Sequence, residues 1–207
     1  DSAHDDEFSD VMVKVGRVQL LILLFVYGGF IVVGKYFIKM WAGPGFESAY
    51  GMLIITLFPA LVPLSQNIGI EIQRAKNMHK FRSIVLGLLA VVNIIITYCS
   101  LRIFGLQGSV FGYVFSLAVG NGLLMNLYNH FVVGLNMLNF WKSTFKILIG
   151  SALSVVIGLS LQVVIKVDDL MSFGLVGSVY AIVFYLIWYF WSANANEKNV
   201  LNGFLRK

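Results

Sequence analysis

The chain has 207 residues, of which 58% are hydrophobic and only 12% are charged. Soluble domains average about 45–50% apolar and about 25% charged residues, so this composition excludes an ordinary soluble domain and indicates a membrane protein. The formal net charge of +5 gives no reason to expect nucleic-acid binding, because basic residues in a membrane protein first report its topology. Cys99 is the single cysteine, which excludes an intrachain disulfide and a Cys-rich metal site.

The first segment, residues 1–17, begins with the polar and acidic sequence "DSAHDDEFSD". It has no basic start followed by an apolar stretch, so it is not a secretory signal peptide. It also lacks an initiator Met. We therefore expect residues 1–17 to be a cytoplasmic loop between helices of a longer protein.

Six apolar stretches follow the first segment. A helix needs roughly 20 residues to cross a hydrocarbon core about 30 Å thick, and strands of a membrane barrel would be shorter and would alternate strictly. The sequence therefore predicts an all-α membrane protein with a six-helix transmembrane domain over residues 18–191 and a cytoplasmic tail over residues 192–207. The predicted spans are residues 18–40, 50–72, 84–104, 108–129, 145–165 and 173–191.

The positions of Lys and Arg predict the orientation, because cytoplasmic loops carry an excess of basic residues. Eleven basic residues fall on one side of the predicted spans and four on the other, so both termini are predicted to be cytoplasmic. The cytoplasmic set is Lys14, Arg17, Arg74, Lys76, Lys80, Arg82, Lys142, Lys146, Lys198, Arg206 and Lys207. The outer set is Lys35, Lys39, Arg102 and Lys166.

The second predicted span contains Pro59 and Pro63, followed by Ser65, Gln66 and Asn67. Each proline removes a backbone donor and displaces the carbonyl four residues earlier. Such carbonyls survive at membrane depth only where protein or a water-filled cavity covers them. The segment is therefore either a broken helix that lines a substrate pathway, as in many transporters, or a simple kink packed against neighbouring helices.

A basic segment follows at Arg74, Lys76, Lys80 and Arg82, where Glu71 and Arg74 stand close enough to pair on a helix. These charges can bind anionic headgroups, each contributing about 1 kcal/mol. They would also attract a diphosphate, so a topology anchor and a contribution to substrate binding are compatible.

Lys35 is the deepest cation in the predicted spans. It lies about six residues past the middle of the first span, or roughly 9 Å outward at 1.5 Å per residue. The half-thickness of the core is about 15 Å. Lys35 therefore either extends to the outer interface or lines a cavity. Lys39 is predicted at the interface.

The amides in or near the spans are further candidates for the pathway: Gln66, Asn67, Asn93, Asn121 and Asn126. Each either lines the pathway or forms a hydrogen bond between helices, worth about 0.6 kcal/mol. Asn121 and Asn126 are separated by about 140° on a helix of 3.6 residues per turn, so they are not expected to share one narrow face.

Small residues recur every four positions at Gly112, Ser116 and Gly120, which predicts close packing of one helix against another. Trp41 and Trp141 lie at span ends and are predicted to belong to the aromatic belts at the membrane surfaces.

One region is similar to a known family. It contains "AKNMHKFRS", which is followed by a span that contains an Asn and then by the pattern G-L-x-G-x-x-x-G. The sequences "GNGLLMNLYNH" and "NFWK" come after it. The matching residues are Asn77, His79, Lys80, Arg82, Ser83, Asn93, Gly105, Leu106, Gly108 and Gly112. Over residues 11–146 the chain resembles the polysaccharide flippases, the O-antigen and capsule exporters of the MOP superfamily.

The resemblance implies a larger, two-lobed transporter with a MATE-like fold, of which this chain supplies the C-terminal part. It implies export of an oligosaccharide linked to a prenyl diphosphate of the undecaprenyl type, from the inner to the outer leaflet of a bacterial inner membrane. Membrane lipids and polysaccharide polymerase or other assembly proteins are the implied partners. A flippase breaks no bond, so neither a cofactor nor a metal is expected.

Three other functions stay open. An ion-coupled drug or metabolite antiporter of the same superfamily would rely on buried carboxylates, whereas a net cationic cavity favours a lipid diphosphate. An intramembrane enzyme would need a nucleophile and base or a metal cluster at depth, and no such arrangement occurs in the spans. A structural membrane partner is the third alternative.

Overall fold

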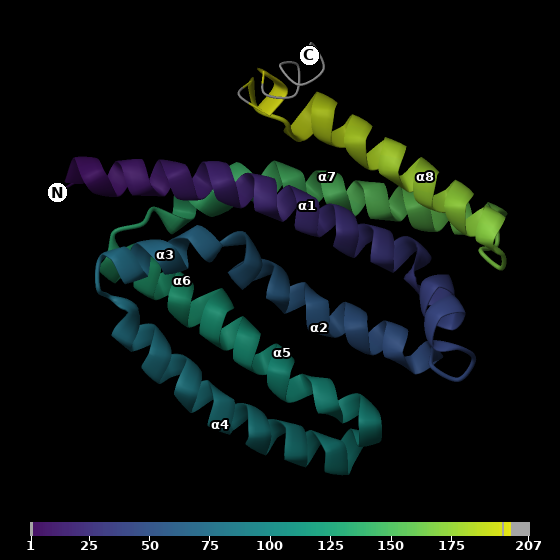
Figure 1. The fold of residues 1–207 in the computed structure, drawn as a ribbon, viewed down its shortest axis with the longest axis horizontal. Coiled ribbons are helices and arrows are strands. Elements are labelled where there is room, and N and C mark those ends of the chain that lie inside the picture. Colours follow the sequence, from purple (N-terminus) through teal and green to yellow (C-terminus); the bar gives the residue numbers. More distant parts are fainter. Residues whose placement is uncertain (1, 196, 200–207) are drawn as a thin grey trace. The chain divides into compact units, whose positions relative to one another are not determined.

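The computed structural model describes residues 2–195 and 197–199, and within them it contains helices and no strand, which confirms the predicted all-α class (Figure 1). The α-helices are α1 (Ser2–Ala42), α2 (Glu47–Ser65), α3 (Asn67–Ala75), α4 (His79–Phe104), α5 (Phe111–Leu117), α6 (Met125–Tyr128), α7 (Met137–Val164) and α8 (Leu170–Ile187). A 3₁₀ turn, η1 (Gly105–Val110), precedes α5, and π-helical turns form η2 (Ala118–Leu124), η3 (Asn129–Val133) and η4 (Trp188–Ser192).

Five helical stretches of the described chain are long and apolar enough to cross a membrane: Asp6–Ala42, Glu47–Ser65, His79–Val133, Met137–Val164 and Leu170–Ser192. Many of their large apolar side chains are exposed. In α4, for example, Leu89 is buried while Leu88 and Ile94 are 65% and 71% exposed. A helix that exposes this much apolar surface is stable in hydrocarbon rather than in water, so the structure indicates a multi-pass membrane protein.

The chain divides into two units, which are described separately. Unit 1 contains Asp1–Leu23 and Ser48–Ser143, and unit 2 contains Leu24–Glu47 and Thr144–Lys207. Both α1 and α7 contribute residues to each unit.

The start of unit 1 corrects the expectation for residues 1–17, because α1 is helical from Ser2 and not a loop. Met12 is only 2% exposed and packs in an apolar core with Ile72, Val133 and Phe140. Burial of this face stabilises the helix, and acidic residues near a helix N-terminus interact favourably with its dipole. At the other end of the chain, residue 196 and residues 200–207, including Arg206 and Lys207, lie outside the described residues.

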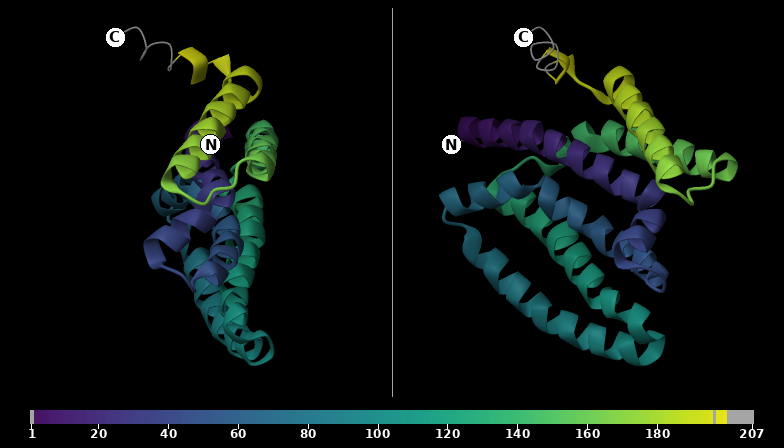
Figure 2. Two further views of the ribbon diagram at one scale, coloured as in Figure 1. Left: turned by 90° about the vertical axis from the view of Figure 1, so that its right-hand side faces the viewer. Right: turned by 45° about the vertical axis from the view of Figure 1, so that its right-hand side comes forward.

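The longest apolar stretch, His79–Val133, has 55 residues, which as one straight helix would be about 80 Å long and far exceed a bilayer core. The chain reverses at η1, where Gly105 has a φ of 61° that favours glycine. As a result, α4 and α5 lie side by side in unit 1 (Figures 1 and 2).

Small residues hold α4 and α5 close together. A Cβ added at Gly112 would overlap Asn93 and Thr97, and the hydroxyl of Ser116 donates to the carbonyl of Leu89 at 3.1 Å. At Gly120 a Cβ would lie 2.7 Å from a methyl group of Leu89. The predicted packing stripe is therefore confirmed.

The second helix breaks within the segment that the prolines mark, although not at the prolines. Helix α2 continues through Pro59 and Pro63 to Ser65. Gln66 then adopts φ −107° and ψ 20°, and α3 begins at Asn67. At the break, the carbonyl of Val62 accepts two hydrogen bonds, from the side chain of Ser65 at 3.0 Å and from the backbone N of Gln66 at 3.2 Å.

In unit 2, parts of α1, α7 and α8 pack around Tyr180. Its hydroxyl donates to the carbonyl of Phe25 at 3.0 Å, and its ring stacks on that of Phe25 with the ring centroids 5.9 Å apart. Helix α8 starts with a capping box, in which the Asp169 carboxylate accepts a hydrogen bond from the backbone N of Ser172 at 2.8 Å and the backbone N of Asp169 donates to the Ser172 hydroxyl oxygen at 3.3 Å. The Ser172 hydroxyl also donates to the Asp169 carboxylate.

Candidate functional site

Three amide side chains of unit 1, Gln66, Asn121 and Asn126, form a cluster that we call the amide cluster. Gln66 and Asn126 exchange two hydrogen bonds, at 3.1 and 3.3 Å. The amide nitrogen of Asn126 also donates to the carbonyl of Asn121 at 2.7 Å. Gln66 and Asn121 are each 5% exposed, so the break after α2 is joined to the π-helical region by buried polar contacts.

Two further residues extend the amide cluster. The indole nitrogen of Trp141, at the start of α7, donates to Asn126 at 2.8 Å. Arg82, near the start of α4, donates to the side-chain oxygen of Asn121 at 3.1 Å. Trp141 also packs against the apolar core around Phe140, and its indole nitrogen satisfies a half-buried amide. Its place in an aromatic belt stays a prediction.

Asn121 lies in η2, a π-helical turn that closes its hydrogen bonds over five residues instead of four. The side chain of Asn126 reaches the backbone carbonyl of Asn121, whereas the side chain of Asn121 contacts Arg82. The expectation that the two side chains do not share one narrow face stays a prediction.

The other predicted pathway residues of unit 1 lie apart from the amide cluster. Asn67 is exposed, and Asn93 accepts a hydrogen bond from Thr97 at 3.1 Å within α4. Pro59 is buried in α2, and Pro63 is half-buried. Gln66, Asn93 and Asn121 thus all form hydrogen bonds within the protein. Those of Gln66 and Asn121 join separate segments of the chain, whereas that of Asn93 lies within α4.

The basic segment divides into two pairs. Arg74 and Lys80 are exposed, and Arg74 pairs with Glu71 at 2.9 Å as predicted. Lys76 and Arg82 are half-buried, and the Lys76 ammonium donates to the carbonyl of Val133 at 2.7 Å. Because Arg74 and Lys80 are the exposed pair, they can contact lipid headgroups more fully than Lys76 and Arg82 can.

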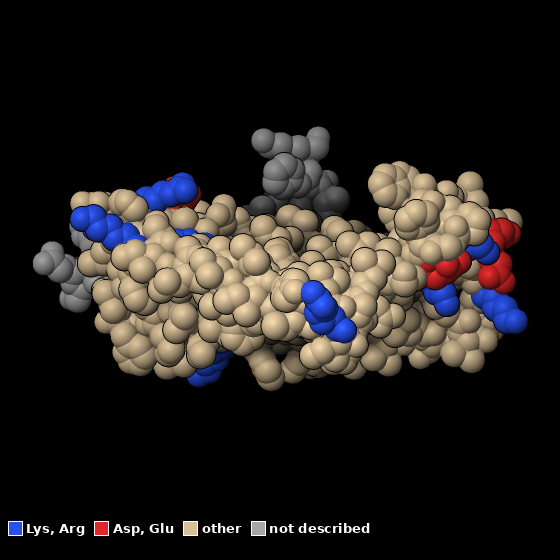
Figure 3. Space-filling view, turned by 90° about the horizontal axis from the view of Figure 1, so that it is seen from below, with Lys and Arg blue, Asp and Glu red and all other residues tan. Residues whose placement is uncertain are grey.

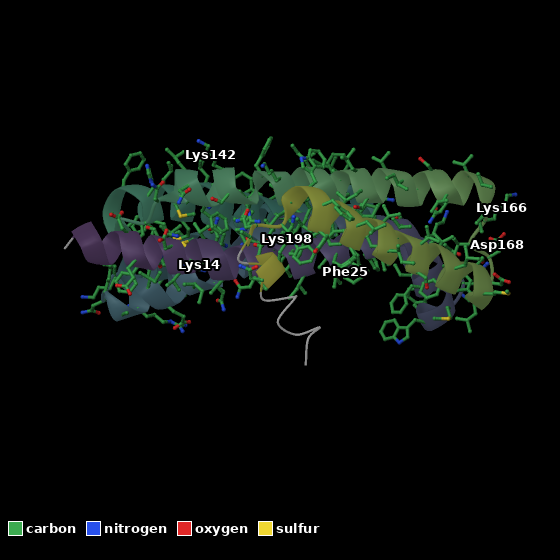
Figure 4. All side chains as sticks on the ribbon, turned by 90° about the horizontal axis from the view of Figure 1, so that it is seen from above. Lys14, Phe25, Lys142, Lys166, Asp168 and Lys198 are labelled. Atoms are coloured by element: carbon green, nitrogen blue, oxygen red, sulfur yellow. The ribbon has the colours of Figure 1, made fainter. Side chains whose placement is uncertain are left out.

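A cavity of about 460 Å³ lies within unit 2, and we call it the lysine cavity. It is lined by Val32, Val33, Lys35, Tyr36, Lys39, Glu47, Gln162, Lys166, Val167 and Asp168. Figure 3 shows acidic and basic side chains gathered together at the right-hand edge of the view. Figure 4 labels Lys166 and Asp168, which lie near each other around the loop between α7 and α8.

Helical spacing brings the lysine cavity together. Lys35 and Lys39 are four residues apart on α1, so they lie on one face. Gln162 lies in the last turn of α7 and its amide donates to the carbonyl of Val32, while Lys166 follows in the loop after α7. Gly158 permits this approach, because a Cβ there would lie 2.7 Å from a methyl group of Val32.

The lysine cavity carries three lysines and two carboxylates, a net charge of +1. Within the described part of the chain, no ion pair joins Lys35, Lys39 or Lys166 to Glu47 or Asp168. All five charged side chains are exposed, so water competes for each of them. The ammonium groups are therefore available to an anionic ligand, and the carboxylates to a hydrogen-bond donor.

Of the residues predicted to line a pathway, Lys35 is the one that the structure places in this cavity. Sequence reasoning did not connect it with Tyr36, Gln162 and Asp168. The spacing of Lys35 with Lys39 was a usable signal, but nothing in the sequence indicates that α7 lies against this part of α1. No group of three or more His, Cys, Asp or Glu that could hold a metal occurs among the residues described.

Comparisons of the chain with protein-family models, with curated proteins and with solved structures found no match.

Proposed function

We propose that this chain is part of a flippase that moves prenyl-diphosphate-linked oligosaccharide units from the inner to the outer leaflet of a bacterial inner membrane. The observation that carries the proposal is the lysine cavity, where three lysines outnumber two carboxylates in a chain of apolar helices. A net cationic cavity with hydrogen-bonding groups suits the anionic, sugar-bearing head of such a lipid. The motif resemblance over residues 11–146 gives independent support.

The proposed topology has six crossings with both termini cytoplasmic, as the C-terminal part of a two-lobed, MATE-like transporter. The reversal at η1 supports it, because it divides the stretch His79–Val133 into two antiparallel halves. Each half then has a length that suits one crossing. In this topology the lysine cavity opens toward the outer side, since Lys35, Lys39 and Lys166 all belong to the outer set.

The chemistry required is binding and release, because flipping breaks no covalent bond. Lysine ammoniums donate hydrogen bonds to phosphate or carboxylate oxygens, and the amide of Gln162 and the hydroxyl of Tyr36 offer groups for sugar hydroxyls. The weak, water-exposed charges of the cavity favour a ligand that must leave on the outer side.

A cation antiporter of the same superfamily is the second candidate, and the carboxylates Glu47 and Asp168 in the cavity favour it. The three lysines of the cavity outnumber these carboxylates, however, and would repel a cation. The flippase is therefore the better supported of the two.

The experiment uses the natural protein that carries this sequence, expressed in a host whose own copy has been deleted. Replacing Lys35, Lys39 and Lys166 together by Gln is expected to abolish surface polysaccharide and to leave lipid-linked units on the inner leaflet. The matched control is Lys142→Gln, because Lys142 is an exposed lysine of unit 1 that points away from its helix (Figure 4).

Protein level in the membrane is measured for every variant, so that loss of expression is recognised. Normal surface polysaccharide in the triple variant, or in the deletion strain itself, would refute the proposal. Loss of cation-dependent antiport with unchanged polysaccharide would support the second candidate instead.

A further inference from the structure

The two carboxylates of the lysine cavity restrict what the cavity can bind. Glu47 and Asp168 line the same space as the three lysines. An ionised carboxylate a few ångströms from a negative charge on the ligand weakens binding of that ligand by about fivefold in a water-like environment, equivalent to about 1 kcal/mol. A diphosphate carries more than one negative charge and meets both carboxylates. Toward a diphosphate, the two carboxylates therefore offset two of the three lysines.

Hydroxyl groups fit this mixture of side chains better. An ionised carboxylate only accepts hydrogen bonds and a lysine ammonium only donates them, whereas a hydroxyl does both. A ligand with several hydroxyls can therefore satisfy Glu47, Asp168 and the lysines at once. This pattern is what a saccharide offers.

Tyr36 adds an apolar surface to the wall of the cavity. Its ring packs against Phe173, with the ring centroids 5.5 Å apart, which holds the ring in a fixed orientation. Aromatic rings present an apolar face together with a polar tip, and a sugar ring likewise combines apolar C–H groups with hydroxyls. The cavity volume of about 460 Å³ is within the usual range of small-molecule sites, about 300–1,000 Å³.

We propose that the lysine cavity binds the saccharide part of its ligand, specifically a sugar that carries a single acidic group, in preference to the diphosphate. The net charge of +1 leaves one positive charge for the acidic group after the carboxylates are balanced. This inference rests on the proposed function and assigns the part of the polar head that occupies the cavity.

The test is isothermal titration calorimetry on the purified natural protein in detergent, with three probes. They are a uronic-acid disaccharide, the matching neutral disaccharide and inorganic pyrophosphate. We expect the acidic disaccharide to bind about fivefold more tightly than the neutral one, the effect of one unit charge. It should also bind more tightly than pyrophosphate, which has no hydroxyl groups to donate to Glu47 and Asp168.

Two variants and one control sharpen the result. Lys166→Gln is expected to weaken the acidic disaccharide about fivefold and to leave the neutral one nearly unchanged. Asp168→Asn is expected to strengthen pyrophosphate binding by at least about fivefold and to weaken both disaccharides. Lys142→Gln, outside the cavity, is expected to change none of the affinities. Lys166 and Asp168 are exposed, so their substitution leaves the packed core intact, and thermal unfolding verifies this.

The inference would be overturned if pyrophosphate bound more tightly than the acidic disaccharide, or if neither disaccharide bound. It would also be overturned if Lys166→Gln and Lys142→Gln bound the acidic disaccharide with equal affinity. The proposed function has a different readout, which is surface polysaccharide in cells. If the protein binds the acidic disaccharide but its triple variant still exports polysaccharide, the inference stands and the flippase proposal is refuted. The opposite pattern would refute the inference alone.

Discussion

Asn126 is the residue through which the amide cluster is connected, and Asn126→Leu replaces its amide with an apolar side chain of similar branched shape. The substitution eliminates the two bonds exchanged with Gln66, the bond to the carbonyl of Asn121 and the bond from the indole of Trp141. The partner groups of all three residues then lose a hydrogen-bond partner in a buried or half-buried setting.

The expected cost follows from these four bonds. Hydrogen bonds between membrane helices average about 0.6 kcal/mol each, so the loss is about 2 kcal/mol. A larger cost would arise if the partners cannot find water, because an unsatisfied buried group costs about 1–3 kcal/mol. For a protein of this size, about 2 kcal/mol lowers the unfolding temperature by roughly 4–8 °C.

The assay is thermal unfolding of the purified protein in detergent, and the matched control is Asn67→Leu. Asn67 is an exposed amide at the start of α3, next to Gln66 in sequence, and it lies outside the amide cluster. We expect the control to unfold close to the wild-type temperature. If Asn126→Leu unfolds within about 2 °C of the control, the amide cluster does not stabilise unit 1 and the reasoning from its hydrogen bonds is refuted.

Two further predictions concern packing and pH. Gly16→Ala places a Cβ 2.5 Å from the ring of Phe140, so overpacking should lower the free energy of unfolding by about 1–3 kcal/mol, whereas Gly51→Ala, with no atom within 4 Å, should raise it by up to about 1 kcal/mol. Equal unfolding temperatures of these two variants would contradict the packing argument. Hydrogen bonds from the side chain and then the backbone of Ser172 lower the pKa of Asp169, so its contribution to stability is present above about pH 4 and is lost as the pH falls through the lowered pKa. Between pH 6 and pH 3, the unfolding temperature of Asp169→Asn should therefore fall less than that of the wild type, as measured by circular dichroism. If the difference in unfolding temperature between the two proteins is the same at both pH values, the role of this cap is contradicted.

The sequence predicts much of the fold because its strongest signals are local. Apolar stretches of membrane length locate the helices, the Gly112, Ser116 and Gly120 spacing identifies a packing face, and the spacing of Glu71 and Arg74 identifies an ion pair. Each signal depends on residues a few positions apart, where helical geometry determines the distances.

The remaining features depend on irregular geometry or on distant segments. A π turn changes the phase of a helix without a distinctive residue type, so the contact between Asn126 and Asn121 was not predictable from regular spacing. The lysine cavity requires Gln162 and Lys166 to lie near Lys35, more than 120 positions away in the chain. The helical conformation of residues 2–17 was missed because Met12 is buried by partners that are also distant in sequence.

The tight pairing of α4 and α5 has a consequence for the order of folding during synthesis. The contact between Ser116 and Leu89 spans 27 residues, so this hairpin can form as soon as α5 has left the ribosome. The amide cluster has to wait longer, because Gln66 and Asn126 are 60 positions apart and the indole of Trp141 is made later still. The hairpin can therefore serve as a preassembled surface on which the earlier and later helices of unit 1 are ordered.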